Sequence, residues 1–262
     1  MQLELICEKP KISSHPTPLL FIHGKWHAAW CWAEHFLPYF ADHGYTSYAL
    51  SLRGHGASEG SERLRWTSIA EYVADVTQVV GQMDTPPVLI GHSMGGFITQ
   101  KYLETHTVPA AALLTSIPPT GLWPTTWQIL THHPLLVLKM ITTLSMYPMI
   151  STQAMVHEAF FSQDMPEEQV AAYKVRMQDE SFRSYLDELG LNLMHAKRVK
   201  TPLLVIGAED DTVIPMKGIR ATANAYHTPA VFFPHTAHDV MLESSWQAVA
   251  DRILEFLNER GI

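Results

Sequence analysis

The sequence predicts an α/β protein with a mostly parallel, doubly wound sheet and an inserted helical cap. Short apolar runs alternate with helical patterns along most of the chain, which is typical of βαβ units. This alternation stops between residues 117 and 198. The runs that we interpret as strands are Leu19–His23, Tyr45–Leu50, Val88–Gly91, Ala110–Thr115, Leu203–Gly207 and Val231–Phe233.

Two further stretches carry apolar residues at spacings of three and four, which places them on one face of a helix. The first runs from Ile69 to Met83, and the second runs from Trp246 to Leu257. Ser244 or Ser245 is the expected N-cap of the second helix, because a serine oxygen can accept from a free N–H group at a helix start. We therefore expect the chain to end on a helix.

Residues 117–198 are expected to form a helical cap on a core made of residues 1–116 and 199–262. The turn-forming sequence at 117–121, Ile-Pro-Pro-Thr-Gly, marks the start of this cap. Its helix-like segments are separated by Pro124, Pro134, Pro148 and Pro166. Its large apolar side chains either line an adaptable pocket or pack the cap against the core. They include Trp127, Met140, Met146, Met149 and Met155.

The composition is that of a globular protein and argues against nucleic acid as a partner. The 262 residues are enough for one large core, and a formal charge of −8 gives no basic surface for nucleic acid. The two cysteines, Cys7 and Cys31, rule out a disulfide framework, and we expect both to be small buried residues. We expect neither a metal nor a cofactor, since the sequence shows no ligand spacing typical of a metal site.

The N-terminus lacks a basic segment followed by a long apolar one, so we expect a cytoplasmic protein without a secretory signal. The most membrane-like stretch, Leu135 to Ile150, contains Lys139 and Pro148 and is shorter than the roughly 20 residues of a spanning helix. We interpret it as cap or core, with peripheral contact to lipid as an alternative. The oligomeric state stays open, a homodimer included.

Residues 91–96 read Gly-His-Ser-Met-Gly-Gly at the point where an apolar run changes into a helical pattern. This arrangement places Ser93 on a sharp strand-to-helix turn. Such a turn needs strained backbone angles and close packing, which Gly91 and Gly95 tolerate because they lack a Cβ. Ser93 is therefore a candidate nucleophile.

A serine nucleophile needs a base to take its proton and a carboxylate to orient that base. The predicted strand 203–207 is followed by an acidic turn that contains Asp210 and Asp211. The predicted strand 231–233 is followed by a loop that contains His235 and His238. Serine, aspartate and histidine thus each lie in a loop that follows a predicted strand, and they come in an order known from one family of hydrolases.

The chain resembles the α/β-hydrolases, serine esterases among them. The resemblance rests on the elbow, on the His23-Gly24 pair with the Trp-containing loop behind it, and on residues 51–58, which match an R-G-H-G-x-S loop. These motifs are similar to those of plant methylesterases, hydroxynitrile lyases and many bacterial esterases. The resemblance covers the core at both ends and leaves the cap almost unconstrained.

The resemblance implies roles for five residues. Ser93 would be the nucleophile, and the backbone N–H groups of Lys25 and Met94 would form an oxyanion hole. The family's carboxylate usually lies four residues before the proline of its turn, which favours Asp211 over Asp210. The family's histidine is commonly followed, after four intervening residues, by an acidic residue, which favours His238 over His235.

Structural roles are the alternative for several of these side chains. Either aspartate could instead cap the helix that starts near Pro215, and His235 could be a loop residue bonded to backbone. The remaining histidines near the motifs are expected to support loops around the site. They are His23, His55 and His92. The Lys25 side chain is expected to point into solvent; if it pointed inward, it would favour anionic or polar acyl groups.

The resemblance implies hydrolysis of carboxylic esters of small to medium apolar molecules through an acyl-enzyme, without a cofactor. Relatives that break carbon–halogen bonds or epoxides use an aspartate at the elbow, so Ser93 disfavours that chemistry. Thioester, lactone, amide and C–C hydrolysis and acyl transfer would use the same machinery and stay open. Hydroxynitrile lyase activity is less favoured, because Asp239 follows His238 where that activity normally has a lysine. A non-catalytic binding protein on the same fold is the remaining alternative, disfavoured by the apparently complete triad.

Overall fold

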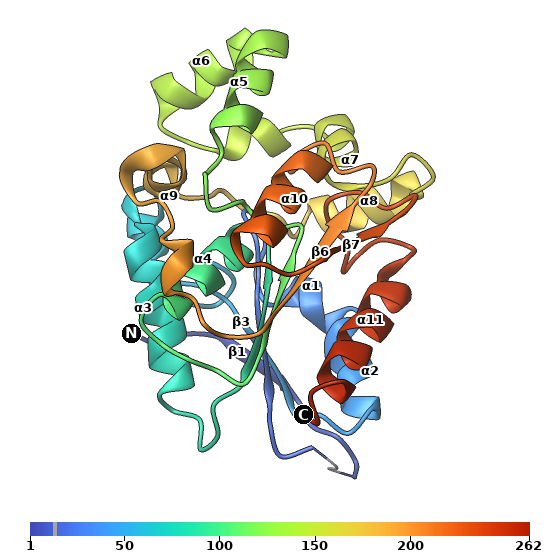
Figure 1. Ribbon diagram of the computed structural model, residues 1–262. Helices are drawn as coiled ribbons and strands as arrows, with labels where there is room; N and C mark the ends of the chain where they lie inside the picture. The colour runs from blue at the N-terminus through green and yellow to red at the C-terminus, as the bar shows by residue number, and fades with distance from the viewer. Residues whose placement is uncertain (13–14) are drawn as a thin grey trace.

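The computed structural model describes residues 1–12 and 15–262, and its centre is a seven-stranded sheet (Figure 1). The strand order is β1-β3-β2-β4-β5-β6-β7. β1 pairs with β3 in antiparallel fashion, and every other pair is parallel. The strands are β1 (Leu5–Glu8), β2 (Leu19–Ile22), β3 (Ser47–Leu50), β4 (Val88–His92), β5 (Ala111–Leu114), β6 (Leu203–Ala208) and β7 (Ala230–Phe233).

The predicted α/β class and parallel sheet are confirmed, and each of the six predicted strands is present within one or two residues of its expected ends. Strand β1 was not predicted: its short apolar run, Leu5-Ile6-Cys7, lies between two glutamates, and its residues are mostly exposed at the sheet edge. Cys7 lies on this strand and is exposed, so the expectation that it is buried was wrong; Cys31 is buried. An edge strand has only one neighbour to cover it, which explains its weak apolar pattern.

Helices cover both faces of the sheet, with α1, α2 and α11 on one side and α3 and α4 on the other (Figure 1). The two helices predicted from spacing are present as α3 and α11. α3 begins with a capping box made by Ser68 and Glu71, whereas Ser245 precedes α11 without a side-chain cap bond. The core helices are α1 (Trp30–Ala33), α2 (Phe36–Asp42), η1 (Ser61–Trp66), α3 (Ile69–Val80), α4 (Met94–Leu103), α10 (Met216–Ala225) and α11 (Trp246–Asn258).

A long helical segment connects β5 to β6, where the cap was expected. Its prolines start helices as well as separating them: Pro134 is the first residue of α6, and Pro166 is the N-cap of α8. Its elements are α5 (Trp123–His132), α6 (Pro134–Thr143), η2 (Tyr147–Ile150), α7 (Gln153–Phe160), α8 (Glu167–Lys174), α9 (Phe182–Leu186), η3 (Asp187–Leu191) and η4 (Ala196–Arg198). The division into core and cap at residues 117 and 198 stays a prediction.

The register of the parallel strands gathers their following loops at one edge. Ile22 of β2 pairs with Gly91 of β4, and Leu114 of β5 pairs with Ile206 of β6. The carboxyl ends of neighbouring parallel strands lie together, and ligands commonly bind in the crevice outside them. The loops after β2, β4, β6 and β7 hold the candidate site residues. Among the described residues, none of the helices has the length and apolar character needed to cross a bilayer.

Candidate active site

Ser93 occupies a strained elbow between β4 and α4. Its backbone angles are φ 51° and ψ −114°, a combination that residues other than glycine rarely adopt. The glycines beside it have no room for a larger residue: a Cβ on Gly95 would lie 2.2 Å from the Ile22 carbonyl oxygen, and one on Gly91 would lie 2.5 Å from the Gly95 carbonyl oxygen. The glycines therefore allow α4 to approach β2 and β4 closely enough to hold the turn.

The structure brings Ser93, His238 and Asp211 into one hydrogen-bonded chain. The Ser93 Oγ lies 2.9 Å from His238 Nε2, and Asp211 Oδ2 accepts a 2.8 Å bond from His238 Nδ1. All three residues are buried, so water competes little for these bonds. The second Asp211 oxygen accepts from the backbone N–H groups of Val213 and Ile214, at 2.8 Å each, which fixes the carboxylate.

The alternative candidates, Asp210 and His235, lie outside this chain. Both are exposed. The backbone N–H of Asp210 donates to the Thr236 carbonyl, and His235 sits on a turn with φ 51°. The capping alternative for the acidic turn is also resolved: α10 has Pro215 as its N-cap, while Asp211 holds the preceding turn and His238 together.

Three further histidines support the loops, as expected for His23, His55 and His92. His23 Nε2 accepts from the Leu52 N–H at 3.0 Å, and His92 Nε2 donates to the His238 carbonyl at 3.0 Å. Burial, together with the neighbouring His238, lowers the pKa of His92 to about 3, so its ring is neutral at pH 7. His55 pairs with the buried Glu180 at 3.2 Å.

A buried pair that the sequence did not predict, His27 and Asp239, links two loops of the site. His27 Nε2 lies 3.0 Å from Asp239 Oδ2, and His27 Nδ1 bonds the Lys25 carbonyl at 2.7 Å. Burial disfavours the charged form of His27, but the carboxylate of Asp239 outweighs it and raises the His27 pKa. The loop after β2 is thus joined to the residue next to His238. The sequence offered only one sign of this pair: His27 lies close to the His23-Gly24 motif, and Asp239 directly follows His238.

The Lys25 side chain does not point into solvent, which corrects the expectation from sequence. Its Nζ is buried 2.9 Å from Glu188 Oε2 and donates to Ser184 Oγ at 3.1 Å. Burial raises the pKa of Glu188 to about 7 despite the opposing effect of Lys25, with the nearby Glu180 and Asp187 adding to the rise. An amine in an apolar interior needs such partners, since a buried charge is stable only when paired.

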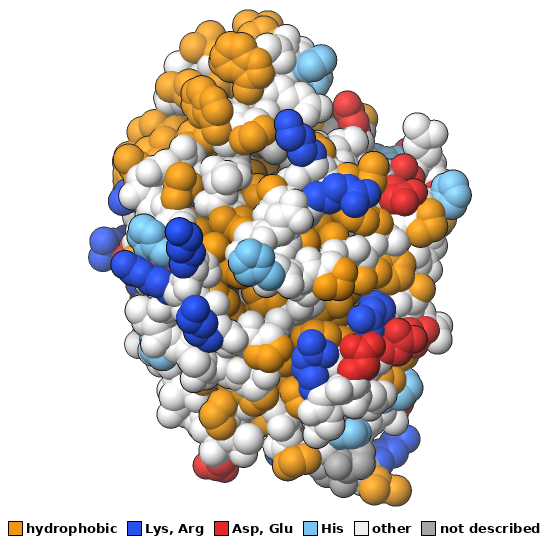
Figure 2. Space-filling model, viewed as in Figure 1, with side chains coloured by type: hydrophobic (Ala, Val, Ile, Leu, Met, Phe, Trp, Pro, Cys, Tyr) orange, Lys and Arg blue, Asp and Glu red, His pale blue; other side chains and the backbone are white. Residues whose placement is uncertain are grey.

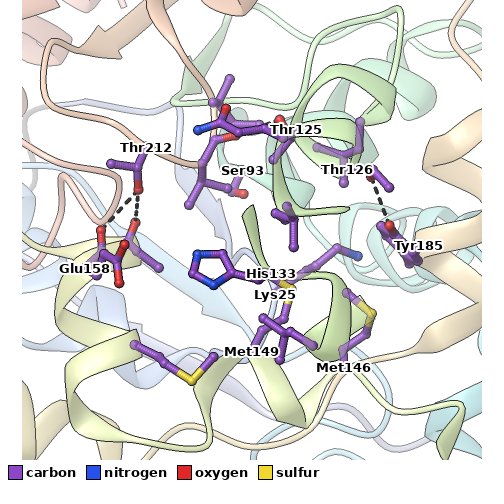
Figure 3. A pocket seen from close by; sticks show the side chains of 18 of the residues that line it. Lys25, Ser93, Thr125, Thr126, His133, Met146, Met149, Glu158, Tyr185 and Thr212 are labelled. Carbon is purple, nitrogen blue, oxygen red and sulfur yellow. Dashed lines mark hydrogen bonds between the residues drawn. The ribbon is translucent and has the colours of Figure 1, made fainter. Parts of the chain in front are cut away.

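A cavity of about 370 Å³ opens beside Ser93 (Figure 3). Its polar lining includes Lys25, while most of the wall is apolar and comes from the segment between β5 and β6. The apolar lining includes Ile117, Leu122, Ile129, Leu136, Met146 and Met149. Five side chains of this segment were predicted either to line a pocket or to pack the cap against the core. Three of them line this cavity: Met146, Met149 and Met155. Met140 is buried in the core, and Trp127 is exposed.

The backbone near Ser93 can supply donors for a negatively charged oxygen. Met94 is the first residue of α4, where N–H groups have no carbonyl one turn earlier in the helix. A Cβ on Gly24 would lie 3.0 Å from the Ser93 Cβ, so the loop that carries Lys25 packs directly against the elbow. Both N–H groups predicted for the oxyanion hole are therefore on segments that border Ser93.

Within residues 1–12 and 15–262, one group of side chains could hold a metal ion by its chemistry. Potential ligand atoms of His92, His238 and Asp239 lie within 4.8 Å of one another. Both His238 nitrogens face Ser93 and Asp211, and Asp239 pairs with His27. The donors therefore fit a network of hydrogen bonds and ion pairs better than a metal site.

The comparison with known families matches residues 19–252 to the family described as "Alpha/beta hydrolase family". The chain belongs to the alpha/beta hydrolase family. This match spans Lys25, Ser93, Asp211 and His238 together with the strands that precede them. The fold class predicted from sequence is therefore confirmed together with the family.

Individual known proteins are similar to this chain over different lengths. A monoacylglycerol lipase of Mycolicibacterium smegmatis is 27% identical over 239 residues, which are 86% of this chain and 82% of the lipase. The protein phosphatase methylesterase 1 of Bos taurus is 35% identical over 103 residues, 38% of this chain and only 27% of that protein. The solved esterase EaEST of Exiguobacterium antarcticum shares the fold, with a TM-score of 0.76, 17% identity and coverage of 98% of this chain and 96% of the esterase.

Proposed function

We propose that this alpha/beta hydrolase is a serine hydrolase that cleaves carboxylic esters of small to medium apolar molecules through an acyl-enzyme. The observation that carries the proposal is the buried chain from Ser93 through His238 to Asp211, with the serine on a strained elbow. A nucleophile, a base within 3 Å and a carboxylate that orients the base are the parts that acyl transfer by serine requires.

In the first step, His238 Nε2 takes the proton from Ser93 Oγ as the oxygen attacks the ester carbonyl carbon. The carbonyl oxygen becomes negative, and the N–H groups of Lys25 and Met94 stabilise it. His238 then gives its proton to the leaving alcohol as the C–O bond breaks, which leaves the acyl group on Ser93. Asp211 holds the His238 ring in position and stabilises its charged form.

In the second step, His238 takes a proton from water, which attacks the acyl carbonyl from the emptied side of the site. The tetrahedral intermediate collapses, His238 returns the proton to Ser93, and the carboxylic acid leaves. Thioesters and lactones would follow the same steps, because each presents a carbonyl carbon with a leaving group.

The shape and lining of the cavity support the apolar substrate class. Its volume of about 370 Å³ lies in the range of small-molecule pockets, and most of the surface of its wall is apolar. Two of the relatives are by name a monoacylglycerol lipase and a methylesterase, which supports ester substrates. We propose that residues 117–198 act as the cap that forms most of this wall.

The test is turnover of p-nitrophenyl esters of graded acyl length by the wild type and by Ser93→Ala. We expect Ser93→Ala to lower turnover by about three orders of magnitude or more, since triad residues act as a unit. Ser116→Ala is the matched control, because Ser116 is a buried serine that follows the neighbouring strand β5, and it should stay active. Substantial turnover by pure Ser93→Ala would contradict the proposal.

A further inference from the structure

Helices α5 and α6 form a hairpin that projects from the end of the molecule and exposes large apolar side chains (Figures 1 and 2). The exposed fraction reaches 57% for Trp127 and 78% for Leu135. We call these six side chains the hairpin face: Trp123, Trp127, Leu130, Leu135, Leu138 and Ile141. Contiguous exposed apolar surface of this kind marks a site of interaction rather than ordinary surface variation.

The hairpin face follows helical spacing, so it is one side of each helix. Its members lie four and three residues apart on α5 and three residues apart on α6. The opposite sides serve the fold and the pocket: Ile129 and Leu136 line the cavity, and Val137 and Met140 are buried. Each helix therefore has one apolar side that the fold uses and a second that stays in water.

The charge around the hairpin face indicates what covers it. The chain carries a formal charge of −8, yet there is no Asp or Glu between Glu104 and Glu158. The titratable side chains on the hairpin itself are Lys139, His132 and His133, all of them exposed, and the two histidines also line the cavity. A membrane surface carries negative charge, so it repels the rest of this acidic protein and accepts this end.

We propose that the hairpin face docks the protein onto a lipid surface, with the six apolar side chains in the interfacial layer. Tryptophan favours that layer, and a lysine beside apolar residues can reach the headgroups. Two projecting helices can enter a fluid surface, whereas a second copy of the chain would have to offer a complementary groove. Docking of this kind is peripheral, and it needs no spanning helix.

Docking has a consequence for catalysis that rests on the proposed function. Because the inner sides of α5 and α6 line the cavity next to Ser93, a lipid surface at the outer side lies close to the pocket wall. An apolar ester could then pass from the lipid to the pocket with little exposure to water. Docking itself does not depend on this step.

The experiment is flotation of the full chain with vesicles of phosphatidylcholine that contain a minor fraction of phosphatidylglycerol. The test variant is Leu135→Asp with Leu138→Asp, whose side chains do not line the cavity; an aspartate near the start of α6 also suits the helix dipole. The matched control is Val175→Asp with Leu191→Asp, at exposed apolar positions outside the hairpin (82% and 67%).

We expect the wild type and the control to float with the vesicles, and the hairpin variant to bind at least about tenfold more weakly because two leucines leave the lipid. Turnover of a short, water-soluble ester should be unchanged in the hairpin variant, which shows that it is folded. Failure of the wild type to float, or equal binding of the hairpin variant, would overturn the proposal. So would a wild-type dimer, measured by light scattering, that the hairpin variant converts to a monomer without any vesicle binding. Vesicle binding by Ser93→Ala separates docking from the proposed catalysis.

Discussion

Two adjacent carboxylates, Asp210 and Asp211, meet very different surroundings after β6. Asp211 is buried and bonds His238 and two backbone N–H groups, whereas Asp210 is exposed. A carboxylate can hold an imidazole in one orientation only when it is itself fixed and shielded from water. The burial and hydrogen bonds of the two side chains therefore favour Asp211 over Asp210 as the acid of the proposed triad.

We expect Asp211→Asn to reduce ester turnover by about two to four orders of magnitude, because an amide can hold the wrong tautomer of His238. Asp210→Asn, one residue away and with the same change of chemistry, should stay close to wild type. Steady-state kinetics of the two purified variants with one p-nitrophenyl ester provides the measurement. A larger loss for Asp210→Asn would place the acid at the other position.

At the same scale, the order of the site residues was visible in the sequence and several of their partners were not. Ser93, Asp211 and His238 each follow an apolar run, so their gathering at one sheet edge could be expected. Glu188, the partner of Lys25, lies in a segment without a strand pattern, and the contact depends on how that segment folds back. This is why the direction of the Lys25 side chain was predicted wrongly.

At the scale of elements, the elbow depends on how closely α4 approaches the sheet. A Cβ on Gly95 would lie 2.2 Å from the Ile22 carbonyl oxygen and 2.5 Å from that of His23, and both neighbours are backbone atoms that cannot rotate away. Gly218 in α10 is different, because a Cβ there would meet its nearest atom at 3.4 Å. Gly95 and Gly218 are thus suited to a comparison of the same substitution at a crowded and an open helix position.

We expect Gly95→Ala to lower the free energy of unfolding by about 3 kcal/mol or more, as overpacking moves α4 away from β2. Gly218→Ala should be neutral or stabilise by up to about 1 kcal/mol, through helix propensity. Urea unfolding of both variants measures the difference. Equal stability of the two would mean that α4 can shift without cost and that the glycine is not required by packing.

Elements were predictable where they are buried on both faces and unpredictable where they are not. The inner strands, such as β2 and β5, are wholly buried and read as continuous apolar runs. β1 is mostly exposed, and its apolar run of only three residues was not interpreted as a strand. Between β5 and β6, the presence of helices could be predicted from helix-like segments and proline positions, but the way α5 and α6 share their faces between pocket and solvent depends on tertiary packing.

At the scale of the whole molecule, topology assembles the site from four loops that are distant in sequence. The hairpin of α5 and α6, which contains no Asp or Glu, forms part of the wall of the cavity beside this site. Ser93 and His238 are 145 residues apart in sequence, and the parallel strand order brings them to 2.9 Å. The match to the alpha/beta hydrolase family spans both of these residues, and most of the residues that line the cavity come from the segment between β5 and β6. The prediction of a cytoplasmic location stays untested, and the oligomeric state stays open.

The most direct test of the proposed mechanism is covalent labelling with an alkyl fluorophosphonate, which phosphonylates activated serines, followed by peptide mass spectrometry. The proposed mechanism predicts a single adduct per chain on Ser93 and a loss of ester turnover in proportion to labelling. Ser116, buried at the end of the next strand, should remain unmodified. Full turnover after Ser93 is labelled, or inactivation by an adduct on another residue with Ser93 unmodified, would contradict the proposal that Ser93 is the nucleophile.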